Sequence, residues 1–202
     1  MDKAAYATVM GKLSDAGVLV AVVNLDPLRI PTQMQDMKGS PISSSTTVLR
    51  IAFEVQKLLG ISVEEWILMG HGEGACAVTD VIRNAPAAKS GKHCRCVLWS
   101  PTSFLHDLSH TSASVLVVHT SDGALGSGEV VAKILPRSSE KNQTMQYVLG
   151  GGSHSGFAHY GPGTFKTEKD NRTKTLAEQQ KEVRDLTLDF ILQRESSIGK
   201  KD

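Results

Sequence analysis

A glycine-rich turn, Gly70-His71-Gly72-Glu73-Gly74, follows an apolar run of strand length and precedes a helical pattern. Serine-dependent acyl-transfer enzymes present their nucleophile in this setting, in the pattern G-x-S-x-G, on a tight strand-to-helix turn that favours small flanking residues. Here the residue between the two bracketing glycines is Gly72. Glycine accepts the backbone angles of such a turn, but it has no oxygen that could form an acyl bond. The sequence therefore predicts the turn without its nucleophile.

Glycine-rich turns between a strand and a helix also bind nucleotides, which is the main alternative for this motif. The dinucleotide spacing G-x-G-x-x-G fails here, because position 77 is Ala. A nucleotide loop is also expected in the first strand–helix unit of a chain, whereas an earlier strand and helix are predicted here. The nucleotide interpretation is therefore disfavoured.

Two further residues could complete an acyl-transfer site. Asp122 follows the apolar run Ser114–His119, and His154 follows three glycines after the run Met145–Leu149. Ligand-binding loops of open α/β sheets lie at the carboxyl ends of the strands, and α/β-hydrolases supply nucleophile, acid and histidine in this chain order. Taken alone, Asp122 equally fits a turn and His154 an exposed loop. Their joint placement after the turn favours a catalytic acid and base.

The pattern of elements predicts a sheet that could bring these residues together. Runs that are apolar on both faces are typical of parallel strands covered on both sides, and five occur: Val18–Val23, Trp66–Met69, Cys96–Trp99, Ser114–His119 and Met145–Leu149. Helical patterns alternate with them: Ala4–Leu13, Val48–Leu59, Gly74–Ile82, Glu129–Leu135 and Leu176–Leu192. We expect an α/β fold, a doubly wound and mostly parallel sheet of about five to six strands flanked by helices.

Length and composition limit the class of protein. The 202 residues suit one domain, residues 1–195, with a polar tail at 196–202. The net charge of +1 gives no electrostatic reason to expect nucleic acid or an anionic membrane as a partner. Apolar runs stay far below the roughly 18 residues of a membrane span, and charges interrupt the N-terminal apolar positions where a signal peptide would need a continuous run. A cytoplasmic protein is expected.

Three cysteines could in principle bind metal. Cys94 and Cys96 have the spacing of a zinc half-site beside His93, but no second pair lies at a suitable distance. Cys94 and Cys96 are better explained as two small residues at the start of a buried strand. Cys76 is expected to pack against the sheet as a small hydrophobic side chain.

Three stretches resemble the alpha/beta hydrolase fold-5 family, a dienelactone-hydrolase-like branch of the α/β-hydrolases: "YATVMGKLSDAGVLVAVVNLDPLRI", "WILMGHGEGACAV" and "GGGSHSGFAHYG". In that family the histidine lies in G-x-x-H-x-x-F-x-x-Y-G, which this chain fits at Gly151, His154, Phe157, Tyr160 and Gly161. Two features depart from the family: Gly72 stands where the family has serine, and the strand and loop that precede the first helix in family members are missing, so the domain is expected to be N-terminally shortened.

The resemblance implies a role for each matching residue. Asp122 would be the triad acid and His154 the base, with Gly72 at the vacant nucleophile position. His71 and Glu73 would flank that position, and the backbone amide of Glu73 would supply one hydrogen bond of the oxyanion hole. Contacts to a small ester-like ligand are expected from His71 and three aromatic residues, for which core packing is the alternative: Trp99, Phe157 and Tyr160. Neither a metal nor an organic cofactor is expected, because triad chemistry uses none.

Three functions stay open from the sequence. An ancestral hydrolase of small esters could have lost serine-type hydrolysis with its serine, and replacement by Ser153 or Cys76 is disfavoured. A hydrolase fold could serve as a non-catalytic binding or interaction protein. Finally, His154 could activate water directly in the space that serine vacates. Whether the chain is an enzyme is undecided at this stage.

Overall fold

A computed structural model describes ten segments of the chain: residues 3–22, 34–35, 41–42, 54–60, 66–84, 94–101, 106–121, 129–139, 143–159 and 173–192. Two predicted site residues, Asp122 and Tyr160, lie outside these segments, as does the polar tail.

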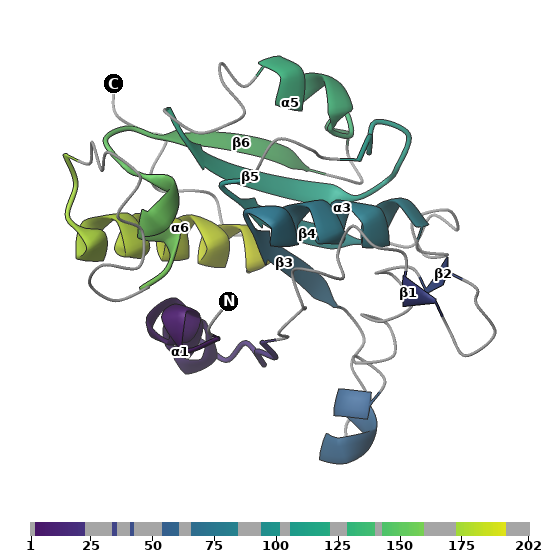
Figure 1. The fold of residues 1–202 in the computed structure, drawn as a ribbon, viewed down its shortest axis with the longest axis horizontal. Helices are drawn as coiled ribbons and strands as arrows, with labels where there is room; N and C mark the ends of the chain where they lie inside the picture. Colours follow the sequence, from purple (N-terminus) through teal and green to yellow (C-terminus); the bar gives the residue numbers. More distant parts are fainter. Residues whose placement is uncertain are drawn as a thin grey trace.

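The centre of the fold is a parallel sheet of four strands in the order β3-β4-β5-β6 (Figure 1). The strands are β3 (Ile67–His71), β4 (Arg95–Trp99), β5 (Ser114–Thr120) and β6 (Thr144–Leu149). Every residue of β5 is buried, as expected of a central strand whose two faces are both covered. Four of the five predicted strands and the parallel arrangement are therefore confirmed.

Helices cover both faces of the sheet, which confirms the doubly wound architecture (Figure 1). On one face, α3 (Glu73–Asn84) packs through Ala75, Val78 and Ile82 against alternate residues of β4 and β5, with α5 (Glu129–Ile134) beside it. On the other face lie α1 (Ala7–Asp15), which follows the 3-10 turn η1 (Lys3–Tyr6), and α6 (Leu176–Ile191). The period-2 alternation of a strand divides its side chains between these two cores.

The prediction of a strand at Val18–Val23 is wrong for the part that the structure describes. Residues 18–22 follow α1 without forming a strand, and Leu19 and Val22 are 57% and 43% exposed. An apolar run becomes a strand only where a neighbouring strand supplies its hydrogen bonds, and in the described segments β3 pairs with β4 alone. This run shows no such pairing.

The segment between α1 and β3 contains two short strands and one helical stretch among its described residues. The short strands β1 (Met34–Gln35) and β2 (Pro41–Ile42) pair antiparallel inside the segment expected to be a long loop. Within the predicted helix Val48–Leu59, residues 54–59 are helical, and Leu58 and Leu59 on it are exposed. No helix in the described segments is both long and apolar enough to cross a membrane.

Candidate active site

The turn between β3 and α3 has the shape expected of a nucleophile elbow. Gly72 joins the last residue of β3 to the first of α3 and has a φ of 57°, in the left-handed region that L side chains rarely adopt. Its N–H donates to the carbonyl oxygen of Trp99 at 3.0 Å, and its own carbonyl accepts from the N–H of Ala75 at 3.1 Å. The first bond ties the turn to the end of β4, and the second closes the turn onto the start of α3.

The two bracketing glycines differ in how much space surrounds them. A Cβ at Gly70 would lie 2.3 Å from the carbonyl oxygen of Gly74, so only glycine fits there. A Cβ at Gly74 would meet nothing within 4 Å, so the space around Gly74 does not explain the expected preference for a small residue on that side of the turn. Ala75 is fully buried against the sheet, and the amide of Glu73 lies at the N-terminus of α3, where backbone N–H groups have no acceptor within the helix.

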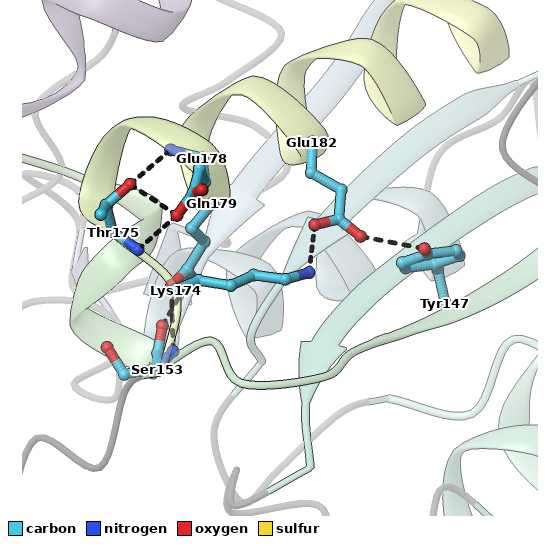
Figure 2. A network of polar contacts seen from close by, with 7 residues as sticks. All are labelled: Tyr147, Ser153, Lys174, Thr175, Glu178, Gln179 and Glu182. Carbon is cyan, nitrogen blue, oxygen red and sulfur yellow. Dashed lines mark hydrogen bonds and ion pairs between the residues drawn. The ribbon is translucent and has the colours of Figure 1, made fainter.

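His154 lies at the carboxyl edge of the same sheet, at the start of the 3-10 turn η2 (His154–Phe157) that follows β6. The preceding residue, Ser153, is gripped by α6: its N–H donates to Gln179 Oε1 at 3.0 Å, and its carbonyl accepts from Gln179 Nε2 at 2.7 Å (Figure 2). Gln179 is fully buried. A Cβ at Gly156 would lie 2.1 Å from Gln179 Oε1, so glycine at that position lets the amide reach the loop.

The N-terminus of α6 is itself firmly held. Thr175 and Glu178 form a capping box, and Lys174 pairs with Glu182, whose other carboxylate oxygen accepts from the hydroxyl of Tyr147 at 2.9 Å (Figure 2). Helix α6 is thereby fixed to β6 on one side and to the His154 loop on the other.

The imidazoles of His71 and His154 stack on one another, with ring centroids 4.5 Å apart. His71 is the residue directly before Gly72, so this contact places His154 beside the elbow. Phe157 stacks on the ring of His71, at 5.5 Å. The sequence-predicted base and the predicted nucleophile position are thus neighbours in the structure.

Hydrogen bonds and burial define the state of His71. Burial, reinforced by the neighbouring His154, lowers the pKa of His71 from 6.5 to about 3, so the ring is neutral near pH 7. Its Nε2 lies 3.2 Å from the carbonyl oxygen of His154 and must carry the proton, because a carbonyl only accepts. Its Nδ1 then accepts from the hydroxyl of Tyr6 at 2.7 Å. His71 therefore links the helical N-terminal segment to the backbone of His154.

Ser100 is a site residue that the sequence analysis missed. Its Oγ lies 2.8 Å from Nδ1 of His154, and the residue is 2% exposed. Ser100 has a φ of 37°, and it is the one residue other than glycine with a positive φ in the described segments. Its position directly after β4, at the edge where Asp122 and His154 were sought, is the signal that could have found it. Tyr6 had no comparable signal.

The remaining predicted residues fall into two groups. Trp99 and Phe157 are buried in the core between the sheet, α1 and α6, and the indole N–H of Trp99 donates to Thr187 Oγ1 at 3.1 Å. Their contact with a ligand stays a prediction, as do the roles of Asp122 and Tyr160.

The cysteines take structural positions. Cys96 is fully buried in β4, and burial raises the pKa of its thiol, while Cys76 and Cys94 pack against the core at its edge. The described segments contain no group of three His, Cys, Asp or Glu residues arranged to hold a metal ion. The interpretation of these residues as small core side chains agrees with this placement.

Comparison with known proteins identifies the fold. No family model matches the chain, and no curated protein sequence matches it significantly. A protein of unknown function from Agrobacterium tumefaciens, described as a candidate α/β-hydrolase, shares the fold with a TM-score of 0.50 at 16% identity. The match covers 75% of this chain and 62% of that protein, so this chain spans less than two thirds of its length.

Two further solved structures are similar over smaller parts. One is a carboxylesterase from Mesorhizobium loti, with a TM-score of 0.36, 14% identity, and coverage of 52% of this chain and 51% of the other. The second is an acylaminoacyl peptidase from Pyrococcus horikoshii, with a TM-score of 0.47, 11% identity, and coverage of 87% and 30%. The fold comparison rests on the first protein together with the sheet topology: the chain has an α/β-hydrolase-like fold.

Proposed function

We propose that this chain binds small ester or related acyl compounds at the carboxyl edge of its sheet, with His154 as the base and no nucleophile at position 72. The observation that carries the proposal is the 4.5 Å stacking of His154 on His71, the residue before Gly72. This contact supports the proposal, because it brings the ring of His154 beside the turn at which an α/β-hydrolase carries its serine.

The missing serine determines what chemistry can remain at position 72. Removing one member of a catalytic triad lowers turnover by about 10⁴–10⁶, because the acyl bond or the proton transfer is lost. We therefore propose that serine-type hydrolysis through Gly72 is lost or very weak. Asp122 would orient His154, and Tyr160 would contact the ligand. The protein would act without a cofactor, in the cytoplasm.

The test compares turnover of p-nitrophenyl acetate and butyrate by the native chain, Gly72→Ser, and Gly72→Ser combined with His154→Ala. We expect Gly72→Ser to gain esterase activity and the second substitution to remove that gain. Serine at this position must adopt a φ near 57°, the left-handed geometry in which elbow nucleophiles are held. A Gly72→Ser variant that is folded and as inactive as the native chain would refute the proposal that His154 is poised there.

Direct activation of water by His154 is the second candidate. Nδ1 of His154 is held by Ser100, and the described residues offer no hydrogen-bond partner to Nε2. That nitrogen could take a proton from a water in the space beside Gly72. Native turnover that disappears in His154→Ala would favour this candidate, whereas saturable ligand binding without turnover would favour a purely binding protein.

A further inference from the structure

Ser100 directly follows β4, the strand that pairs with β3, at the end of which Gly72 lies. In the register of β3 and β4, Gly70 pairs with Leu98 and His71 with Trp99, and Gly72 and Ser100 are the residues that follow this last pair. The N–H of Gly72 donates to the carbonyl of Trp99, so the segments that follow β3 and β4 are still hydrogen-bonded just after the last residue pair of the two strands.

The backbone of Ser100 directs this hydroxyl toward the base. Along an extended strand Ser100 would share the face of Cys96 and Leu98, which pack under α3. With a φ of 37° the chain leaves the extended region at Ser100, and Oγ meets His154 Nδ1 at 2.8 Å. Strained backbone angles outside glycine are often kept at functional sites.

The contact has the geometry of an activated nucleophile. A hydroxyl and its base are expected within about 2.6–3.2 Å of one another, and the base must itself be held in place. His154 is held by the grip of Gln179 on Ser153, by the stacked ring of His71, and by the bond from His71 Nε2 to its carbonyl. Ser100 therefore meets both conditions.

We propose that Ser100 is a nucleophile displaced by one strand, with His154 Nδ1 as its general base. Ser100 Oγ attacks the carbonyl carbon of an ester while its proton passes to Nδ1. The acyl–oxygen bond to the alcohol then breaks, and the alcohol leaves with that proton. Water attacks the resulting acyl-serine, gives one proton to Nδ1, and releases the acid as Ser100 recovers its proton. The substrate class rests on the function proposed above.

The hydroxyls of Ser153, Ser155 and Ser114 have partners other than histidine. The hydroxyl of Ser153 lies 3.1 Å from that of Ser155. Ser114 is buried at the amino end of β5, the end remote from His154, and its hydroxyl accepts from the N–H of Gln143 at 3.0 Å. Ser114 is thus a matched control: a buried serine on a parallel strand, bonded to backbone and not to a histidine.

The test is covalent labelling of the full chain with diisopropyl fluorophosphate, followed by intact mass measurement and mapping of the labelled peptide. The Oγ–phosphorus bond forms as the phosphorus–fluorine bond breaks, fluoride leaves, and the proton passes to His154. We expect one label, on Ser100, in the native chain and in Ser114→Ala. His154→Gln should slow labelling by about 10²-fold or more, since general-base assistance contributes about 10²–10⁴.

Two variants remove the hydroxyl of Ser100, so that the test does not depend on the folding of one variant alone. Ser100→Ala keeps the strained φ, whereas Ser100→Gly accepts that φ at no steric cost. Both should fold by circular dichroism and remain unlabelled, and any ester turnover of the native chain should fall to the blank. Labelling at another residue, or a native chain that stays unlabelled, would overturn the proposal.

Failure here is distinguishable from failure of the function proposed above. If the native chain stays unlabelled while Gly72→Ser acquires a label at position 72 and His154-dependent turnover, Ser100 merely orients His154, and the site at Gly72 stands. If the native chain is labelled on Ser100 while Gly72→Ser adds nothing, the nucleophile is Ser100 and the assignment of His154 to position 72 is wrong. If neither chain reacts, both proposals fail.

Discussion

The grip of Gln179 on Ser153 is the contact on which the placement of His154 depends most directly, and it can be tested on stability. Replacing Gln179 by Met keeps the approximate length of the side chain and removes both hydrogen bonds, at 3.0 and 2.7 Å. The N–H and carbonyl of Ser153 would remain buried without their partner, at about 1–3 kcal/mol for each group. Allowing for entry of water, we expect the free energy of unfolding to fall by about 2–4 kcal/mol.

The neighbouring residue provides the control. Gln180 is also buried on α6, but its Nε2 has no hydrogen-bond partner among the residues that the structure describes. Gln180→Met therefore removes a side-chain nitrogen that lacks a partner there, and we expect it to change the free energy of unfolding by less than about 1 kcal/mol, or to stabilise the fold.

Urea denaturation of the three proteins measures the difference, with the slope against denaturant checked for constancy. The melting temperature of Gln179→Met should lie lower than that of the native chain by about 4–16 °C, at about 2–4 °C per kcal/mol for a chain of this size. Hydrogen exchange of the Ser153 amide should accelerate in this variant alone. Equal losses in the two variants, or a Ser153 amide as protected as in the native chain, would refute the reasoning.

Two further predictions concern the turn at Gly72. The folded protein keeps His71 in its neutral form, with a pKa lowered from 6.5 to about 3. The stability that depends on neutral His71 is therefore fully present above pH 6.5 and is lost as the pH falls from 6.5 toward 3, because the unfolded chain takes up the proton first. His71→Gln has no such titration, so between pH 7 and pH 4 its free energy of unfolding, measured in urea, should fall by about 3 kcal/mol less than that of the native chain; parallel curves would contradict this. Gly70→Ala places a Cβ 2.3 Å from a backbone oxygen and should destabilise the fold by more than about 3 kcal/mol. A Cβ at Gly74 would meet open space, so Gly74→Ala should cost less than about 1 kcal/mol. Thermal melts of the two variants measure the difference, and equal losses of stability in Gly70→Ala and Gly74→Ala would contradict this prediction.

The centre of the sheet was predictable because β4 and β5 are buried on both faces. Strand β5 reads as an uninterrupted apolar run, and such a run fits few structures other than a covered parallel strand. The run at 18–22 has the same composition but no strand beside it in the described segments. Composition reports what a segment could bury, whereas pairing depends on which segment lies next to it.

Sequence patterns predicted the edge of the sheet at which the site residues lie, but not the contacts between them. The carboxyl ends of parallel strands lie at the same edge of a sheet, so His154 was expected to lie near Gly72. The partners that set its orientation come from positions far along the chain: Ser100 is 54 residues away. The residue that bonds His71, Tyr6, is 65 residues away. Distances of this kind follow from the packing of α1 and α6 on the sheet, and local sequence patterns carry no record of them.

The parts of the site differ in what the fold itself requires. Gln179 and Gly156 hold the loop in place, and His71 connects that loop to Tyr6, so these residues would be kept in a protein that only binds a ligand. A well-placed His154 is therefore weak support for catalysis. Ser100 is different, because a left-handed φ on a residue other than glycine costs roughly 1–3 kcal/mol, which glycine would avoid. A fold that needed only the turn would be better served by glycine there. The hydroxyl of Ser100 is thus the feature of this edge that packing explains least, and its reactivity separates an enzyme from a binding protein more sharply than any property of His154.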